Sequence, residues 1–136
     1  MLRASIDIGT NSTLLLLADV QGASLTRVLD RAVVTRLGAG VDATRALAPD
    51  AVARTLDVLR AYAQELRARG VTSLRAVATS AVRDATNRED FLGPARALLG
   101  VEVETLSGEE EARASFRGAL LGLALDPGTP VVTFDI

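Results

Sequence analysis

The sequence from Ala4 to Val20 reads ASIDIGTNSTLLLLADV, and this stretch predicts how the fold begins. Apolar residues alternate with Ser5 and Asp7 as far as residue 8, which is typical of a strand. Residues 9–12, GTNS, have the composition of a tight turn. The nearly continuous apolar run that follows, residues 13–20, predicts a second strand that is buried on both faces. The chain therefore opens with two strands joined by a short polar turn.

Strands alternate with helices in the rest of the sequence, which favours an α/β domain. We expect further strands over residues 25–37, 74–79 and 101–105, and the first three strands should form an antiparallel meander. The predicted helices cover residues 49–70, about 88–99 and 107 to about 125, with a short helical piece before the second. Gly93-Pro94 predicts a break or kink in the second helix. Residues 131–136 predict another strand, packed on its own domain or on another copy of the chain.

Composition excludes several kinds of chemistry. The 136 residues contain no cysteine and no histidine, so disulfides, thiolate metal sites and a Ser-His-Asp triad are all excluded. All 15 basic residues are arginine, so a P-loop, which needs a lysine, is excluded too. Acid–base chemistry therefore has to come from carboxylates or from water bound to a metal.

Charge and hydropathy bear on partners and location. The net charge is −2 and only 3% of residues are aromatic, which argues against nucleic-acid binding. The longest aliphatic run, residues 14–18, is too short to span a bilayer, and the start does not resemble a secretory signal. The lack of cysteine fits a reducing compartment, so we expect a cytoplasmic protein without a membrane partner.

The turn at residues 9–12 is a candidate anion-binding loop. Gly9 allows a close approach of the backbone, and the N–H groups and hydroxyls of such a turn can surround an anion. Asp7 would stand beside the loop as a hard oxygen ligand for a divalent cation. The alternative interpretation is an ordinary hairpin in which Asn11 and Gly9 serve only the turn geometry.

Arg83 follows the strand predicted at residues 74–79. The carboxyl edge of an open α/β sheet is where ligands bind, and a guanidinium there can hold phosphate oxygens through two N–H groups. The alternative is a surface arginine that pairs with Asp84 or Glu89.

Glu111 lies near the start of the third predicted helix. Ser107 and Glu110 have the spacing of a capping box, so Glu109 and Glu110 need no functional explanation. Glu111 differs because it shares its helical face with the small residues Ser115, Gly118 and Gly122. Such a face lets a ligand or another backbone come close, so Glu111 is a candidate for orienting or deprotonating an attacking water.

Three segments together carry a resemblance. The sequence DIGTNS at residues 7–12 resembles the first phosphate motif of the actin, Hsp70 and sugar-kinase superfamily, which includes both kinases and phosphatases. The segments VATSAVRDATN at 77–87 and SGEEEAR at 107–113, with Gly118 beyond, resemble the exopolyphosphatase/guanosine-pentaphosphate phosphatase family. The resemblance spans nearly the whole chain. It implies an RNase H-like, actin-type α/β fold, here with a five-stranded mixed sheet and flanking helices.

The family resemblance also implies roles for particular residues. It makes Glu111 the catalytic carboxylate and Arg83 a phosphate-binding residue that assists catalysis. The first phosphate loop would consist of Gly9, Thr10, Asn11 and Ser12. Asp135 matches the acidic residue that begins a second phosphate loop, and with Asp7 it would help to hold Mg²⁺ or another divalent cation.

The implied activity is the hydrolysis of a terminal phosphoanhydride in inorganic polyphosphate or guanosine pentaphosphate. We expect residues 1–126 to form a first subdomain and residues 127–136 to be the first strand of a second one. The chain would then be the front part of a longer protein that can form a homodimer, and alone it should release phosphate very slowly or not at all. Two alternatives stay open, namely an ATP-binding phosphotransferase of the sugar-kinase type and a non-catalytic module that binds the alarmone.

Overall fold

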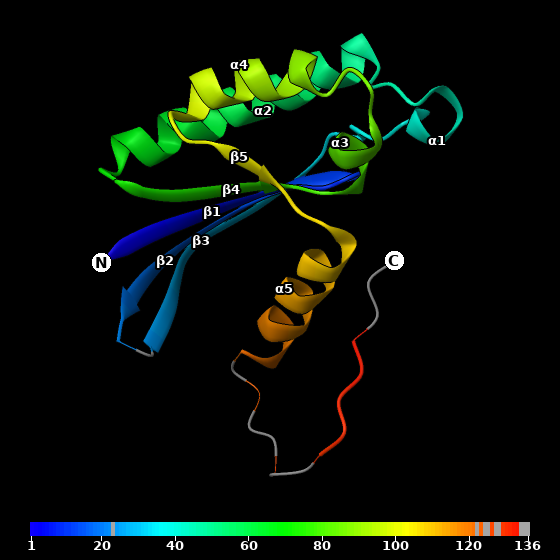
Figure 1. Cartoon of the computed structure of the whole chain (residues 1–136). Coiled ribbons are helices and arrows are strands. Elements are labelled where there is room, and N and C mark those ends of the chain that lie inside the picture. Colours follow the sequence, from blue (N-terminus) through cyan, green and yellow to red (C-terminus); the bar gives the residue numbers. More distant parts are fainter. Residues whose placement is uncertain (23, 122, 124–125, 127–128, 134–136) are drawn as a thin grey trace.

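The computed structural model describes residues 1–22, 24–121, 123, 126 and 129–133. Its strands are β1 (Leu2–Ile8), β2 (Ser12–Gln21), β3 (Ser24–Val34), β4 (Ser73–Ala78) and β5 (Val103–Thr105). Its helices are α1 (Val41–Thr44), α2 (Pro49–Ala68), α3 (Ser80–Asp84), α4 (Glu89–Leu99) and α5 (Gly108–Leu120). The five strands form one sheet in the order β3-β2-β1-β4-β5. The expected five-stranded mixed sheet with flanking helices is thus confirmed (Figure 1).

The sheet is antiparallel on one side of β1 and parallel on the other. β1, β2 and β3 form the predicted antiparallel meander, while β4 pairs in parallel with both β1 and β5. Ile8 lies opposite Ala78 in the parallel pair, and the Thr79 N–H donates to the Ile8 carbonyl at 3.2 Å. The carboxyl ends of β1 and β4 therefore meet at one edge of the sheet, where ligands of open α/β sheets bind.

The two faces of the sheet are covered differently. Ala4, Ile6 and Ile8 of β1 are buried, whereas Ser5 and Asp7 lie on the opposite face. Helices α2 and α4 cover the face with the buried residues, and α5 lies on the other side of the sheet (Figure 1). The sheet thus has a packed face, covered by α2 and α4, and an open face, on the side of α5.

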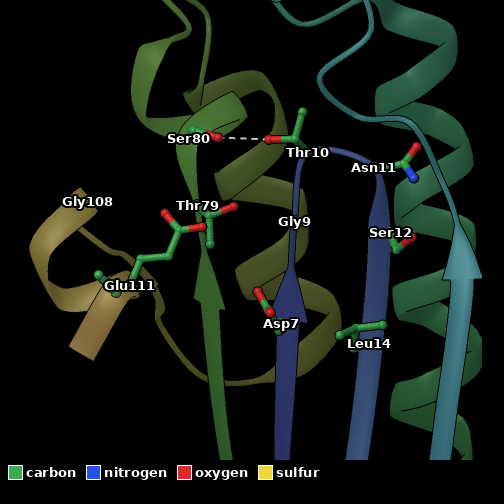
Figure 2. A pocket seen from close by; sticks show the side chains of 11 residues that line it. Asp7, Gly9, Thr10, Asn11, Ser12, Leu14, Thr79, Ser80, Gly108 and Glu111 are labelled. Atoms are coloured by element: carbon green, nitrogen blue, oxygen red, sulfur yellow. Dashed lines mark hydrogen bonds between the residues drawn. The ribbon is translucent and has the colours of Figure 1, made fainter. Parts of the chain in front are cut away.

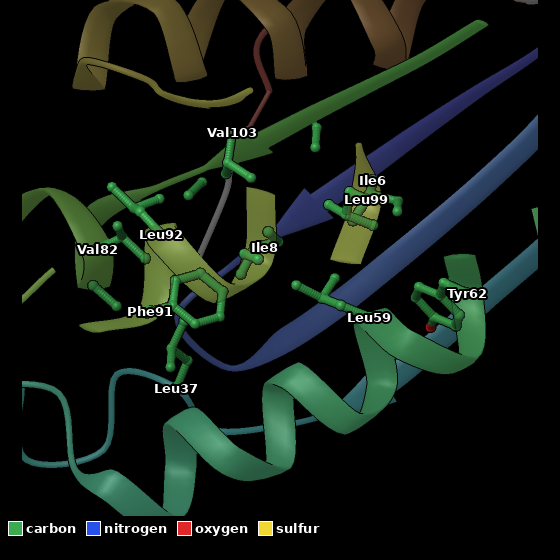
Figure 3. Packing of buried hydrophobic residues seen from close by; sticks show 14 of the residues in the cluster. Ile6, Ile8, Leu37, Leu59, Tyr62, Val82, Phe91, Leu92, Leu99 and Val103 are labelled. Atoms are coloured by element: carbon green, nitrogen blue, oxygen red, sulfur yellow. The ribbon is translucent and has the colours of Figure 1, made fainter. Parts of the chain in front are cut away.

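The core lies between the packed face and the two long helices. Helix α2 spans nearly the predicted residues, begins with Pro49, a favourable first residue, and buries Leu59, Ala63 and Leu66 at helical spacing. Phe91 of α4 is fully buried beside Ile8 and Leu37 (Figure 3). This continuous cluster holds the two helices against the sheet and fixes the edge at which β1 and β4 end.

Two predictions about the helices need correction, and one short helix was not predicted. Helix α4 runs without interruption from Glu89 to Leu99 with Pro94 inside it, so the predicted break is absent. Buried side chains on both sides of Pro94, among them Phe91 and Leu99, hold that helix in place. Helix α5 ends at Leu120, not near residue 125; it buries no side chain, so no packing offsets the glycines near its end. The short helix α1 was not predicted.

Three strand predictions also differ from the structure. β2 is not buried on both faces, because Leu14 is 40% exposed on the open face. The third strand ends at Val34, and residues 35–37 form a turn in which Thr35 and Leu37 are buried. Residues 131–133 are not in a strand, Val132 is 74% exposed, and residues 134–136 lie outside the described part of the chain. Within the described residues no strand pairs with this segment, and an apolar pattern needs a neighbouring strand to satisfy its backbone.

Candidate active site

A cavity of about 540 Å³ opens where β1 and β4 end, between that edge of the sheet and the start of α5. The residues that line it are Asp7, Gly9, Thr10, Asn11, Ser12, Leu14, Thr79, Ser80, Gly108, Glu111 and Ala112 (Figure 2). Every residue of the predicted first phosphate loop is among them, and so are Asp7 and Glu111. The sequence separated these groups by about a hundred positions, and the fold brings them to one cavity.

The loop between β1 and β2 is a tight turn. The Gly9 N–H donates to the Ser12 carbonyl at 2.9 Å, and a Cβ on Gly9 would lie 3.0 Å from that same oxygen. Gly9 is therefore required for the closeness of the turn, and its own N–H is already used. In the described part of the chain, the N–H groups of Thr10 and Asn11 have no protein acceptor, so they are the amides that remain for an anion.

The β4–α3 junction forms the neighbouring wall. Because β1 and β4 are parallel, Thr79 and Ser80 come next to the loop, and the hydroxyls of Thr10 and Ser80 are hydrogen-bonded at 2.8 Å (Figure 2). Thr79 is buried and still lines the cavity. The segment 77–87 contained both residues, but no role was predicted for them. Their position at the carboxyl end of a strand parallel to β1 is the signal that could have found them.

Glu111 enters the cavity from α5. The predicted capping box is present: the Ser107 hydroxyl accepts from the Glu110 N–H at 3.3 Å, and the Glu110 carboxylate accepts from the Ser107 N–H at 2.8 Å. The Ser107 hydroxyl also donates to the Glu110 carboxylate at 2.8 Å, and the two bonds that this carboxylate accepts, from the Ser107 N–H and hydroxyl, lower the pKa of Glu110. With the helix start fixed in this way, Glu111 and Ser115 are half-buried while Phe116 is exposed. The part of this face formed by Glu111 and Ser115 therefore turns toward the sheet, whereas Gly118 is exposed. The Glu111 side chain extends toward Thr79 (Figure 2).

Arg83 lies behind Glu111 and does not line the cavity. Its Nη1 donates to the Leu106 carbonyl at 3.0 Å and lies 3.6 Å from Glu111 Oε2, while its Nε lies 3.4 Å from Asp84 Oδ1. The pairing with Asp84 that the sequence left open is present. The guanidinium thus contacts the candidate catalytic carboxylate, although the sequence reasoning placed it in direct reach of phosphate.

The predicted metal ligands are only partly located. Asp7 lies in the cavity on the open face of β1, and Asp135 falls outside the described residues. Among the residues that the structure describes, no group of three or more acidic, histidine or cysteine side chains could hold a metal ion. A cation at this site would have to draw most of its ligands from substrate and water.

Thr86 and Asn87, at the end of the segment 77–87, have a structural role. The Asn87 side chain accepts from the Leu47 N–H at 2.8 Å and donates to the Leu47 carbonyl at 3.1 Å. The N–H and hydroxyl of Thr86 both donate to the Arg45 carbonyl. These contacts join the α1–α2 connection to the α3–α4 connection, and so hold α3 beside the loop.

Comparison with known proteins decides the family. The model of the Ppx/GppA phosphatase family matches residues 16–136, which is most of the chain. The chain belongs to the Ppx/GppA phosphatase family. It is 45% identical over 145 aligned positions to Exopolyphosphatase 2 of Mycobacterium tuberculosis strain H37Rv, and this alignment covers 98% of the chain and 44% of that relative. The chain thus spans less than half the length of the curated relative it matches.

Solved structures of Ppx/GppA proteins share the fold. The crystal structure of an exopolyphosphatase-like protein matches 91% of the chain with a TM-score of 0.87 and 39% identity, over 38% of its own length. The Aquifex aeolicus Ppx/GppA protein matches 93% with a TM-score of 0.83 and 34% identity, over 41% of its own length. These neighbours have the actin-like ATPase fold, so the predicted fold class is confirmed. No helix within the described ranges is long and apolar enough to cross a membrane.

Proposed function

We propose that this chain provides one side of the active site of a phosphohydrolase that removes terminal phosphate from inorganic polyphosphate, guanosine pentaphosphate or both. One observation carries the proposal: the turn at residues 9–12, Asp7 and Glu111 line a single cavity at the carboxyl ends of β1 and β4. Membership of the Ppx/GppA family supports hydrolysis of a phosphoanhydride. The name of the Mycobacterium tuberculosis relative favours polyphosphate.

The loop and the β4–α3 junction would bind the terminal phosphoryl group. The N–H groups of Thr10 and Asn11 and the hydroxyls of Thr79 and Ser80 are donors around one cavity. Donors fixed in this way stabilise the charge that spreads over the equatorial oxygens during phosphoryl transfer. Leu14 is an apolar lining residue from β2 (Figure 2).

Glu111 would orient and deprotonate the attacking water. The chain has no histidine, and among the described residues Glu111 and Asp7 are the carboxylates that line the cavity. Glu111 lies opposite the loop, so a water held by it can approach a phosphoryl group bound there. Arg83 lies 3.6 Å from Glu111 Oε2 and outside the cavity lining, so it would act on a bound phosphate through its positive charge.

A divalent cation such as Mg²⁺ fits the donors that are present. Mg²⁺ prefers oxygen ligands and is held in phosphate-transfer sites by one or two carboxylates together with phosphates and waters. Asp7 would hold it beside the loop, with Asp135 as the second predicted ligand. The cation would supply additional positive charge near the phosphate oxygens.

Binding of inorganic tripolyphosphate to the chain tests the first part of the proposal. Isothermal titration calorimetry should show binding that Arg83→Ala weakens about two- to fivefold, because the variant removes a positive charge beside the cavity and such a charge interaction is worth about 0.5–1 kcal/mol. The matched control is Arg60→Ala, since Arg60 is an exposed arginine of α2 that pairs with Asp57. Equal loss in both variants, or no binding by the unaltered chain, would contradict the proposal.

Measurement of turnover tests the second part of the proposal, namely hydrolysis. The assay uses the longest natural polypeptide that contains these 136 residues. Release of orthophosphate from polyphosphate and from guanosine pentaphosphate should require a divalent cation and should fall strongly in Glu111→Gln. Glu65→Gln is the matched control, because Glu65 and Glu111 are similarly exposed, at 27% and 30%, and both lie close to arginines. Transfer of phosphate to a small alcohol in place of water would instead indicate a phosphotransferase.

A further inference from the structure

The turn at residues 35–38, between β3 and α1, contacts the phosphate loop through its backbone. The N–H groups of Thr35 and Arg36 both donate to the Asn11 carbonyl, at 3.0 and 2.8 Å, and the Gly38 N–H donates to the Thr10 carbonyl at 2.9 Å. Three donors from one turn therefore hold two consecutive carbonyl groups of the loop. We call residues 35–38 the clamp turn.

The clamp turn controls which side of the loop backbone faces an anion. The chain has only trans peptide bonds in its described part, and in a trans peptide the C=O and the following N–H point in opposite directions. Holding the Thr10 carbonyl toward the clamp turn directs the Asn11 N–H away from it. The two carbonyl oxygens also accept hydrogen bonds from the clamp turn, so these oxygens repel a bound phosphate less.

The clamp turn is itself firmly held. The buried hydroxyls of Thr35 and Thr13 are hydrogen-bonded at 3.0 Å, and Arg54 Nε donates to the Thr35 carbonyl at 2.8 Å. Leu37 is fully buried in the core. Arg36 has a positive φ of 51°, a conformation that costs a non-glycine residue free energy and persists only where its surroundings impose it.

Gly38 lies where the Thr10 methyl leaves no room for a side chain. A Cβ at this position would stand 2.3 Å from Thr10 Cγ2 and 3.1 Å from Ala81 Cβ, so it would meet the loop and helix α3 at once. The backbone of Gly38 is not in the left-handed region, so alanine suits its conformation. The close approach of the loop therefore explains why residue 38 is glycine.

The contact with Thr10 links Gly38 to the site. Cγ2 and Oγ1 of Thr10 are attached to the same carbon, so rotation about χ1 that moves the methyl away from a new Cβ also moves the hydroxyl. That hydroxyl is hydrogen-bonded to Ser80 across the cavity wall at 2.8 Å. A side chain at position 38 would thus separate the two phosphate-facing segments without touching the phosphate.

We propose that Gly38 is a positioning residue for phosphate binding, which acts through Thr10: its lack of a side chain lets the clamp turn fix the carbonyls of the loop and lets Thr10 bond to Ser80. The inference rests on the proposed function, because it assigns the cavity to a phosphate chain. Its ligand class is the terminal phosphoryl group of a polyanion.

A double-mutant cycle with inorganic tripolyphosphate tests the proposal. Gly38→Ala in the natural background should weaken binding at least tenfold by isothermal titration calorimetry. In a Thr10→Ser background, which keeps the hydroxyl and removes the methyl, Gly38→Ala should weaken binding less than threefold relative to Thr10→Ser alone. The contacts that remain, 3.1 Å to Ala81 Cβ and 3.3 Å to Thr10 Cβ, need shifts of only a few tenths of an ångström. Gly93→Ala is the matched control, because a Cβ at Gly93 meets no atom within 4 Å and should leave affinity unchanged.

The outcomes separate this inference from the proposed function. If the unaltered chain does not bind tripolyphosphate, the proposed function is wrong and the inference falls with it. If it binds and Gly38→Ala binds equally well, or loses the same factor in both backgrounds, Gly38 does not act through Thr10. Should Gly38→Ala fail to fold, a folded Gly38→Ala/Thr10→Ser protein that binds like Thr10→Ser supports the proposal, and an unfolded one overturns it.

A readout without ligand checks the same contact. Hydrogen exchange of the Gly38 N–H reports the bond to the Thr10 carbonyl. Protection should fall at least tenfold in Gly38→Ala and return in Gly38→Ala/Thr10→Ser. Unchanged protection in Gly38→Ala would contradict the steric mechanism, whatever the binding result.

Discussion

The packed face and the open face of the sheet differ in what their residues do. On the packed face, side chains of β1, α2 and α4 interdigitate in one apolar cluster (Figure 3). On the open face, Asp7 and Arg75 are polar residues of the strands, and α5 buries no side chain. Burial on one face provides the free energy of folding, and this leaves the other face free to place charged and hydroxyl groups around a cavity. Variants of the packed face should therefore lower stability, whereas variants of the open face should lower activity.

The largest effect is expected from removing a core aromatic ring. Phe91→Ala should lower the free energy of unfolding by about 3–5 kcal/mol, because Phe91 is fully buried and its loss leaves a cavity between α4 and the sheet. Phe116→Ala on α5 is the matched control, since Phe116 is 38% exposed and should cost less than about 1 kcal/mol. Chemical denaturation measures both values. A similar cost at the two positions would mean that α5 is packed as firmly as α4.

The next effect should appear in activity and not in stability. Glu111→Gln should lower the rate of phosphate release about 10²–10⁴-fold, the usual range for loss of a general base. Its free energy of unfolding should change by less than about 0.5 kcal/mol, as for a partly exposed surface residue. Steady-state kinetics and denaturation of the same preparation give the two numbers. Loss of stability in proportion to the loss of rate would make Glu111 a structural residue.

The packed face and the opening strands could be predicted from the sequence because they depend on local pattern. The period of two in β1 follows from the burial of one face, and β1 and α2 were both predicted at nearly the right residues. The family resemblance assigned the loop, Arg83 and Glu111 to one phosphate site, and the loop and Glu111 do line one cavity, whereas Arg83 does not. The roles of these residues remain predictions.

The details of the open face could not be predicted because they depend on packing between distant segments. Arg83 points behind Glu111 because the Leu106 carbonyl, 23 residues further along the chain, accepts its hydrogen bond. The bond between Thr10 and Ser80 joins residues 70 positions apart. Gly38 gave no sign in the sequence, because its role depends on the methyl group of Thr10 in another loop. No periodic pattern or motif in the sequence indicates these contacts.

A smaller loss of stability is expected when a hydrogen bond at the edge of the packed face is removed. Tyr62 of α2 is buried and its hydroxyl donates to the Thr13 carbonyl at 3.1 Å, so Tyr62→Phe should cost about 1 kcal/mol. Burial raises the pKa of Tyr62 above its ordinary value of 10.0. This contribution is therefore complete below pH 10 and is lost as the pH rises through the higher pKa of the folded state. Denaturation between pH 8 and pH 11, at values spaced about one unit apart, should show the difference between wild type and variant shrinking.

The smallest expected effect is a pH-dependent loss of stability in α5, on the open face. The pKa of Glu110 is lowered by its hydrogen bonds with Ser107, and that of Glu104 by its hydrogen bond with Arg75. A carboxyl group with a lowered pKa stabilises the fold above its ordinary value of 4.5, and this stabilisation is lost as the pH falls through the folded-state pKa. The start of α5 depends on this capping box, whereas α2 is held by buried apolar side chains that do not titrate.

Acid should therefore loosen α5 before α2. Hydrogen exchange measured as the pH falls below 4.5 should show protection of the α5 amides decreasing first, after correction for the intrinsic exchange rate. In Glu110→Gln the decrease should be smaller, because glutamine still accepts from the Ser107 N–H and does not titrate. Equal loss in α2 and α5 would show that the two faces unfold as one unit. In that case the open face would share the stability of the core, and the placement of Glu111 would not depend on the capping box.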